Sequence, residues 1–144
     1  MGRIKIDIPE NCVGVVEMPV RITDINYGNH LGNDTVVSII HEARVSWLKS
    51  MGYSELNIEG TSIIMSDLAV SYTNESFYGD ILKIKLAVGD FSSAGFELYY
   101  SITTNRNDME IQIAKAKTGI VFYNYEIKKI AGVPQKFKSK MNQP

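Results

Sequence analysis

The segment 34–51, DTVVSIIHEARVSWLKSM, decides the fold of this chain because it is the one stretch with a clear helical period. At about 100° per residue, most of its apolar side chains fall within one broad arc, which is typical of an amphipathic helix covered on more than one side. Asn33 or Asp34 can cap the start of this helix, and Gly52 stands where a C′ glycine ends one. The residues of the arc are Val36, Val37, Ile39, Ile40, Ala43, Trp47, Leu48 and Met51.

On both sides of this helix, the sequence is typical of β-strands. Gly2–Ile8 alternates apolar and polar residues, and Val13–Ile22 is apolar and β-branched, with Pro19 favouring an edge position or a bulge. After the helix, stretches rich in Ile, Val, Tyr, Phe and Thr are separated by turn residues. Such short connections require antiparallel neighbours. The later stretches are Ser62–Tyr72, Ile81–Val88, Gly95–Thr104 and Ile111–Tyr125.

The order of these elements predicts an α+β fold in which one amphipathic helix lies on one face of an antiparallel sheet. The other face or an edge of the sheet is then left for a partner subunit. From about Pro134 the sequence becomes polar and rich in lysine, which predicts a frayed, solvated tail. We therefore expect a single domain over residues 1–133 and a polar C-terminal tail over residues 134–144.

The composition excludes several classes of protein. The 144 residues include 15 basic and 16 acidic ones, so the net charge does not indicate binding to nucleic acid. Cys12 is the single cysteine and forms no internal disulfide, and the two histidines make a poor metal site. No apolar run approaches the roughly 20 residues that span a bilayer, and the N-terminus lacks the pattern of a signal peptide. We expect a cytoplasmic protein without a bound metal.

The densest polar cluster is the loop Thr23–Asn33, which leads directly into the helix. Unpaired backbone amides at a helix N-terminus form a preorganised donor site for an oxygen that gains negative charge. Gly32 allows a ligand to approach the backbone closely, and His30 lies beside this donor site. The alternative is a loop that only caps the helix, with its Asn and Gly residues serving the turn geometry.

The second histidine, His41, neighbours Glu42 within the helix. Both lie off the apolar arc, which favours a solvated face, although a second subunit over the helix turns such a face into the wall of a pocket. Arg44 lies one turn from His41, and we interpret it as a structural residue that ties the helix to the sheet. The sequence contains no nucleophile elbow, no P-loop and no dinucleotide-binding fingerprint.

The stretch from Arg21 to Gly52 resembles the opening of the hot-dog thioesterases of the 4-hydroxybenzoyl-CoA thioesterase type. In that family a strand ends in D-x-D, a turn and a capping sequence such as H-V-N-N follow, and the next helix carries Glu, Ala and Arg before a Leu and a Gly. Phe77–Leu82 resembles the family's Y-G-D-x-L turn, and Ala114–Phe122 resembles its final strand. The matching residues of the opening are Asp24-Ile25-Asn26, His30-Leu31-Gly32-Asn33, Glu42-Ala43-Arg44, Leu48 and Gly52.

This resemblance implies a hot-dog fold, in which a five- or six-stranded antiparallel sheet wraps around one long central helix. It also implies a homodimer that joins two sheets edge to edge and has its active sites at the subunit interface, or a homotetramer of such dimers. The expected substrate is an acyl- or aroyl-CoA thioester. No cofactor is expected, because CoA is part of the substrate.

The resemblance also implies roles for particular residues. The family's catalytic carboxylate is the second Asp of D-x-D, where this chain has Asn26, whose amide can position water or donate to an oxyanion but cannot act as a base. By similarity to plant acyl-carrier-protein thioesterases, His30 matches a general base, and Glu42 matches a helix glutamate that orients the histidine or activates water. The expected substrate-binding residues are Gly32 and Asn33, whose amides stabilise the oxyanion, and Tyr78 and Gly79 in the later turn.

Two kinds of function fit these residues. The first is an acyl-CoA thioesterase that releases a free acid and CoA through water activation beside the oxyanion site. The second is a hot-dog protein that binds acyl thioesters without hydrolysing them, or only assembles with partners. Asn26 favours the second, whereas His30 and the Gly32-Asn33 cap favour the first. A dehydratase of the same fold fits the order of the motifs less well, and the sequence does not distinguish a CoA thioester from an acyl-carrier-protein thioester.

Overall fold

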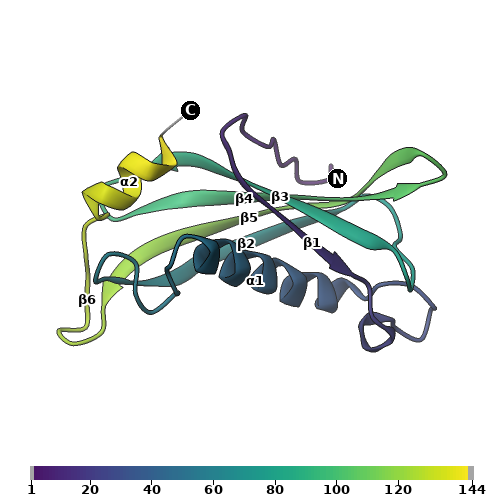
Figure 1. The fold of residues 1–144 in the computed structure, drawn as a ribbon, viewed down its shortest axis with the longest axis horizontal. Coiled ribbons are helices and arrows are strands. Elements are labelled where there is room, and N and C mark those ends of the chain that lie inside the picture. Colours follow the sequence, from purple (N-terminus) through teal and green to yellow (C-terminus); the bar gives the residue numbers. More distant parts are fainter. Residues whose placement is uncertain (1, 143–144) are drawn as a thin grey trace.

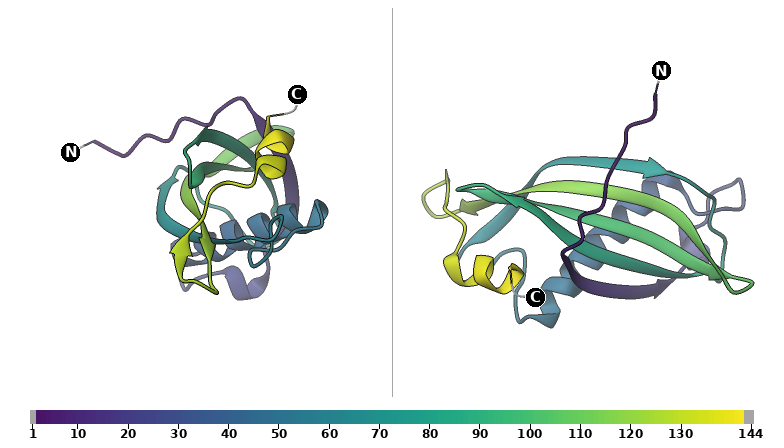
Figure 2. Two further views of the ribbon diagram at one scale, coloured as in Figure 1. Left: turned by 90° about the vertical axis from the view of Figure 1, so that its left-hand side faces the viewer. Right: turned by 90° about the horizontal axis from the view of Figure 1, so that it is seen from above.

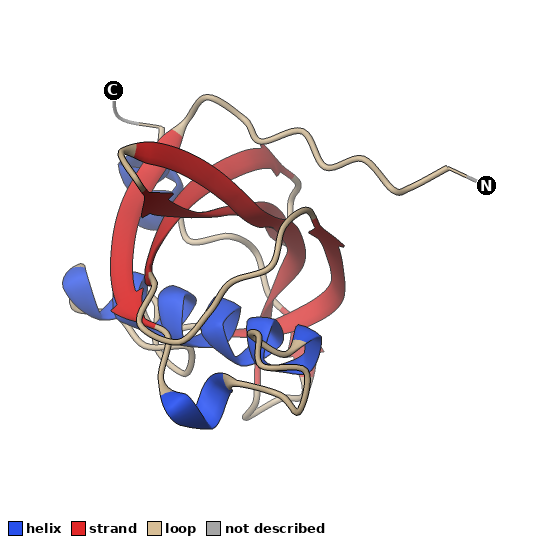
Figure 3. Ribbon diagram, turned by 90° about the vertical axis from the view of Figure 1, so that its right-hand side faces the viewer, coloured by secondary structure: helices blue, strands red, loops and turns tan. Residues whose placement is uncertain are grey.

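The structure is a computed structural model that describes residues 2–142, and it has an α+β fold with one long helix and a six-stranded antiparallel sheet (Figure 1). Helix α1 (Asn33–Ser50) lies along one face of the sheet, which curves around it (Figure 3). The fold predicted from the sequence is therefore confirmed. The other elements are β1 (Cys12–Pro19), a 3₁₀ turn (Ile22–Asp24), β2 (Ser62–Tyr72), β3 (Ile81–Phe91), β4 (Gly95–Arg106), β5 (Met109–Asn124), β6 (Lys129–Ile130) and α2 (Gln135–Met141).

The strands lie in the order β1–β3–β4–β5–β2, and the short β6 also pairs with β5. The longest ladder joins β4 and β5, from Gly95 opposite Val121 to Arg106 opposite Met109. β2 pairs with β5 along its whole length and has no second neighbour within the described chain. One long edge of the sheet, beside α1, is therefore unpaired.

Helix α1 forms where the apolar period predicts it. Val36, Ile40 and Leu48 are almost fully buried and belong to the core between the helix and the concave face of the sheet. Gly52 has a φ of +80°, the left-handed conformation expected of a C′ residue. Val37 belongs to the predicted arc but is 40% exposed, because it borders a hollow between α1 and β2.

The expectation of a frayed, solvated tail from about Pro134 is wrong, because residues 135–141 form helix α2. Phe137 is fully buried and Met141 is 3% exposed, so both side chains lie in the core. The ring of Phe137 packs against five aromatic rings at one end of the molecule. They belong to Trp47, Tyr53, Phe91, Phe96 and Phe122. The spacing of Phe137 and Met141 by four residues places both on one helix face, whereas the surrounding lysines remain at the surface.

The prediction of a strand at residues 2–8 is also wrong. The segment is extended but pairs with no strand of the described chain, and it crosses the face of the sheet opposite α1 (Figure 2). Ile6 is 9% exposed, and the Arg3 guanidinium donates a hydrogen bond to the Tyr72 carbonyl oxygen at 3.2 Å. β1 already occupies the edge beside β3, so the alternating side chains of this arm contact the surface of the sheet instead of extending its ladder.

Candidate functional site

The loop between β1 and α1 is held in place by its own side chains. The buried Asp24 carboxylate accepts a hydrogen bond from the Arg21 backbone N–H at 2.8 Å and lies 3.2 Å from the Arg21 guanidinium. The N–H of Gly32 donates to the Asp24 carbonyl oxygen at 3.1 Å. Asp24 therefore ties the 3₁₀ turn to the start of α1, which is a structural role.

Asn26 forms a tight turn with the residues that follow it. Its Oδ1 accepts hydrogen bonds from the backbone N–H groups of Gly28 at 2.9 Å and His30 at 3.4 Å. The Asn26 N–H in turn donates to the His30 carbonyl oxygen at 2.9 Å. This is the arrangement of an Asx turn, and it leaves Nδ2 as the polar side-chain atom of Asn26 that has no partner within residues 2–142.

The His30 ring is oriented by the backbone beside it. Nδ1 lies 3.2 Å from the Leu31 carbonyl oxygen, which only accepts hydrogen bonds, so the hydrogen of the neutral ring is on Nδ1 and the lone pair is on Nε2. Nε2 lies 3.9 Å from Glu75 Oε1. The side chain is 29% exposed and lines a hollow of about 230 Å³ at the N-terminus of α1, which we name the His30 hollow. Its other walls include Asn33, Val36, Tyr72 and Ile113.

The N-terminus of α1 has no side-chain cap, and Gly32 is the N-cap residue. A Cβ atom at Gly32 would lie 2.7 Å from Asp34 Oδ1, so a side chain there would require the Asp34 carboxylate to move. The N–H groups of the first turn have no acceptor within the helix and carry the positive end of its dipole. The Tyr72 hydroxyl donates to the Asn33 carbonyl oxygen at 2.8 Å, which fastens this first turn to β2. The structure thus brings Asn26, His30 and the predicted oxyanion donors together.

Glu42 is not brought to this site within one subunit. It lies nine residues beyond Asn33, about 13 Å along the helix axis. Its side chain borders a different hollow, together with Arg21 and Asp24. An interaction of Glu42 with His30 of the same chain is therefore excluded, and a role across a subunit interface stays a prediction.

Tyr78 and Gly79 lie in the turn before β3 and do not line the His30 hollow. Tyr78 is 65% exposed. Gly79 has a φ of +91°, and its N–H donates to the Val20 carbonyl oxygen at 3.2 Å, so its backbone conformation serves the turn. Their predicted contact with substrate has no support from the geometry of a single subunit.

Sequence reasoning missed the polar residues that line the His30 hollow from the segment after β2. The Ser76 carbonyl oxygen accepts the Leu31 N–H at 2.7 Å, which places Glu75 beside the histidine ring. No periodic signal marks this segment, because residues 73–80 belong to no helix or strand. Their place beside His30 follows from the pairing of β2 at the edge of the sheet.

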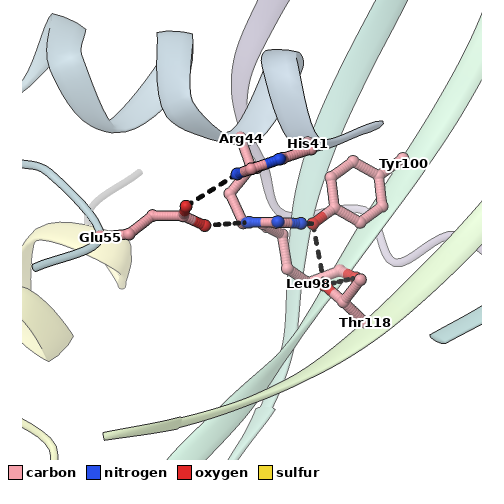
Figure 4. Close-up of polar contacts among 6 residues, drawn as sticks. All are labelled: His41, Arg44, Glu55, Leu98, Tyr100 and Thr118. Carbon is pink, nitrogen blue, oxygen red and sulfur yellow. Dashed lines mark hydrogen bonds and ion pairs between the residues drawn. The ribbon is translucent and has the colours of Figure 1, made fainter. Parts of the chain in front are cut away.

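The interpretation of Arg44 as a structural residue is supported by a chain of polar contacts (Figure 4). Its Nε donates to Glu55 Oε2 at 2.7 Å and its Nη1 donates to the Tyr100 hydroxyl at 3.0 Å, so the side chain links α1 to β4. His41 Nε2 lies 2.9 Å from the other Glu55 oxygen. The acidic partner of Arg44 is therefore Glu55 and not the neighbouring Glu42.

Residues 2–142 contain no group of three His, Cys, Asp or Glu side chains placed to hold a metal ion. Neither helix of this described part combines the length and the apolar character that crossing a membrane requires.

The sheet curved around α1 and the polar site at the start of this helix define the class of protein as a hot-dog protein. Solved structures share this fold. A 1,4-dihydroxy-2-naphthoyl-CoA thioesterase from Synechocystis superposes with a TM-score of 0.78 at 22% identity, covering 90% of this chain and 98% of that one. An Asp-to-Asn variant of 4-hydroxybenzoyl-CoA thioesterase in complex with 4-hydroxybenzoyl-CoA gives a TM-score of 0.79 at 13% identity, with 89% and 97% of the chains covered. For a DHNA-CoA thioesterase from Staphylococcus aureus the TM-score is 0.73 at 18% identity, with 87% and 83% covered.

The sequence profile of the thioesterase-like superfamily matches residues 20–141. The chain therefore belongs to the thioesterase-like superfamily, and its enzyme class is that of the thioester hydrolases. No functionally curated protein matches the chain in a sequence search.

Proposed function

We propose that this protein hydrolyses the thioester bond of an acyl- or aroyl-CoA, giving the free acid and CoA, at the N-terminus of α1. The observation that carries the proposal is that the uncapped first turn of α1 and the His30 ring border the same hollow. Membership in the superfamily supports the thioester bond as the target. The CoA thioesters named for the proteins of similar fold support CoA as the thiol.

The chemistry uses His30 as the general base. Its Nε2 lone pair takes a proton from a water molecule, and the oxygen of that water attacks the thioester carbonyl carbon. The N–H groups at the start of α1, including that of Asn33, stabilise the negative charge on the carbonyl oxygen of the tetrahedral intermediate. Breaking of the carbon–sulfur bond then releases the CoA thiolate, which takes the proton from the imidazolium. Asn26 Nδ2 donates a hydrogen bond that positions the water.

The proposal includes a homodimer joined through the free edge of β2. This edge has no neighbour in the described chain, and Leu68 and Tyr72 of β2 are 44% and 36% exposed although both line hollows that α1 also lines. A second copy along this edge covers both side chains and closes the His30 hollow. Any role of Glu42 in the reaction then requires the partner subunit. Sedimentation equilibrium distinguishes the dimer from a tetramer. We also propose that the protein is cytoplasmic.

The test is the release of free thiol from a panel of aliphatic and aromatic acyl-CoAs, followed with a colorimetric thiol reagent. We expect hydrolysis of at least one member by the wild-type protein. Tight binding of acyl-CoAs without turnover by the wild type would favour the alternative of a non-catalytic binding protein. The specific observation behind that alternative is Asn26, whose amide oxygen is already occupied in the turn.

A further inference from the structure

A second hollow, of about 370 Å³, lies between α1 and β2, and we name it the α1–β2 pocket. It neighbours the His30 hollow along both elements: on α1, Val36 lines the His30 hollow and Val37 lines the α1–β2 pocket. On β2, Tyr72 lines the first and Leu68 the second. Its apolar lining residues are Val37, Ile40, Met65 and Leu68, and its polar ones are His41, Ser66, Asp67, Arg44 and Thr118, of which we call the last two the polar floor.

The polar floor contains a guanidinium that is not fully paired. The Arg44 side chain is only 6% exposed, its Nε donates to Glu55 and its Nη1 donates to Tyr100. Nη2 has no hydrogen-bond partner among residues 2–142. Nη2 is not among the fully buried side-chain atoms that lack a partner, so it borders the open space of the pocket and is the atom of this floor that is available to a ligand.

The charges around Arg44 select the kind of acceptor. Glu55 already compensates the guanidinium and is itself held by His41 Nε2 at 2.9 Å. The pocket is also lined by Asp67, whose carboxylate pairs with Lys117 Nζ at 3.0 Å. A carboxylate of a ligand would find both positive charges already compensated, whereas a neutral hydroxyl or keto oxygen accepts a hydrogen bond without adding charge.

The hydroxyl groups at the floor of the pocket are hydrogen-bonded to each other (Figure 4). Arg44 donates to the Tyr100 hydroxyl, Tyr100 Oη lies 2.8 Å from Thr118 Oγ1, and Thr118 Oγ1 lies 3.5 Å from the Leu98 carbonyl oxygen. Because the Leu98 carbonyl only accepts, the chain of donors runs from Arg44 through Tyr100 and Thr118 to that carbonyl. Nη2 therefore stays the donor left for a ligand.

We infer that the α1–β2 pocket holds the acyl chain of the substrate and that Arg44 Nη2 binds a neutral oxygen, a hydroxyl or keto group, near the far end of that chain. This inference rests on the proposed function, whose reacting carbonyl lies at the start of α1. Arg44 is eleven residues beyond Asn33, about 16 Å along the helix axis. That separation selects an extended acyl chain over a single aromatic ring.

Titration calorimetry with two hydrolysis-resistant thioether analogues of CoA, S-octyl-CoA and S-(8-hydroxyoctyl)-CoA, measures this preference without turnover. We expect the wild-type protein to bind the hydroxylated analogue at least about tenfold more tightly, since a hydrogen bond from a charged donor typically favours the ligand that can accept it by about that factor. In Arg44→Lys, which keeps a positive charge against Glu55 but lacks Nη2, the preference falls to about one.

A second pair of variants tests the pocket without removing Arg44 from its contacts. Val37→Phe fills the α1–β2 pocket from its rim and is expected to weaken both analogues by about tenfold or more. Val45→Phe is the matched control, because Val45 is similarly exposed on the same helix but lies outside the pocket. We expect it to leave both affinities unchanged.

Equal binding of the two analogues by the wild type overturns the inference, as does an unchanged preference in a folded Arg44→Lys protein or equal effects of the two Phe variants. These outcomes leave the hydrolysis of acyl-CoAs intact. If neither analogue nor CoA itself binds the wild type, the proposed function fails as well, so the two failures are distinguishable.

Discussion

His30 Nδ1 lies 3.2 Å from the carbonyl oxygen of Leu31, the next residue in the chain, and this contact determines which ring nitrogen can act as a base. With the hydrogen held on Nδ1, the lone pair is on Nε2 of a ring that lines the hollow at the helix N-terminus. The backbone thus provides the orientation that a carboxylate provides in many catalytic histidine pairs.

Replacement of His30 by alanine is expected to lower kcat for a hydrolysed acyl-CoA by about 100-fold or more, the usual contribution of a general base. The comparison variant is His41→Ala, which removes the other histidine; this residue lies outside the His30 hollow but lines the α1–β2 pocket, so an effect on KM is expected there and not on kcat. Thiol release at saturating substrate measures both. A His30→Ala protein with the kcat of the wild type contradicts the assignment of the base.

Two substitutions at Asn26 separate its role in the turn from its role in the reaction. Asn26→Asp keeps an oxygen that accepts the Gly28 and His30 N–H groups, so we expect the melting temperature to stay close to that of the wild type. Asn26→Ala leaves both groups without their acceptor, which should cost about 1–2 kcal/mol of stability and displace the histidine. We expect kcat/KM to fall at least tenfold in Asn26→Ala. An alanine variant with unchanged melting and unchanged kcat/KM would show that the turn does not need this side chain.

The helix, the later strands and the loop before the helix were predictable because each carries a local signal. The arc of Val36, Ile40 and Leu48 repeats at the helical period, and the residues after Gly52 alternate or cluster as strands do. The nearness of Asn26 and His30 also follows locally, since an Asx turn joins residues only four apart.

The parts that sequence reasoning missed depend on contacts between distant residues. Glu55 lies in a turn with no periodic pattern, and its pairing with Arg44 and His41 exists only once that turn folds back onto α1. The N-terminal arm has the alternation of a strand, yet the edge it would join is taken by β1. For α2, a signal was present in the spacing of Phe137 and Met141, but the surrounding lysines outweighed it in the composition.

The burial of Phe137 predicts that α2 is an integral part of the core. Phe137→Ala removes a fully buried ring that contacts five others, and the expected loss in the free energy of unfolding is about 3–5 kcal/mol. Lys136→Ala, at an exposed position of the same helix, should change it by less than about 0.5 kcal/mol. Urea denaturation measures both, and similar small losses in the two variants would mean that α2 does not pack as described.

Titration of Glu55 is expected to account for part of the decrease in the free energy of unfolding at acidic pH. Burial raises the pKa of this carboxyl, but the hydrogen bonds from Arg44 and His41 lower it more, so its pKa in the folded protein is below the ordinary value of 4.5. A carboxyl group whose pKa is lowered by folding stabilises the folded protein at pH values above its ordinary pKa. This contribution is lost as the pH falls through the pKa of the folded protein. Glu55→Gln does not titrate, so its free energy of unfolding should fall less steeply than that of the wild type on acidification from about pH 6 to pH 3. Parallel pH profiles for the two proteins would contradict this role.

Removal of the Tyr100 hydroxyl is expected to break the polar link between α1 and the sheet while leaving the rest of the side chain in place. Its hydroxyl accepts from Arg44 and lies 2.8 Å from Thr118 Oγ1, and the whole side chain is buried. Tyr100→Phe leaves the guanidinium Nη1 without its acceptor, which should cost about 1–3 kcal/mol. Tyr99→Phe is the matched control, because its hydroxyl contacts only Glu97 at the partly exposed face, and it should cost less than about 0.5 kcal/mol.

A double-mutant cycle with Thr118→Val tests whether the contacts act as one chain. Once the Tyr100 hydroxyl is gone, Thr118 has already lost the shorter of its two hydrogen bonds, so the second substitution should remove less stability than it does in the wild type. We expect a coupling of at least about 0.5 kcal/mol in the free energy of unfolding, which is typical of neighbours in one hydrogen-bond network. Strict additivity of the two substitutions would mean that Arg44, Tyr100 and Thr118 are independent pairs, and that the floor of the α1–β2 pocket is not held as a unit.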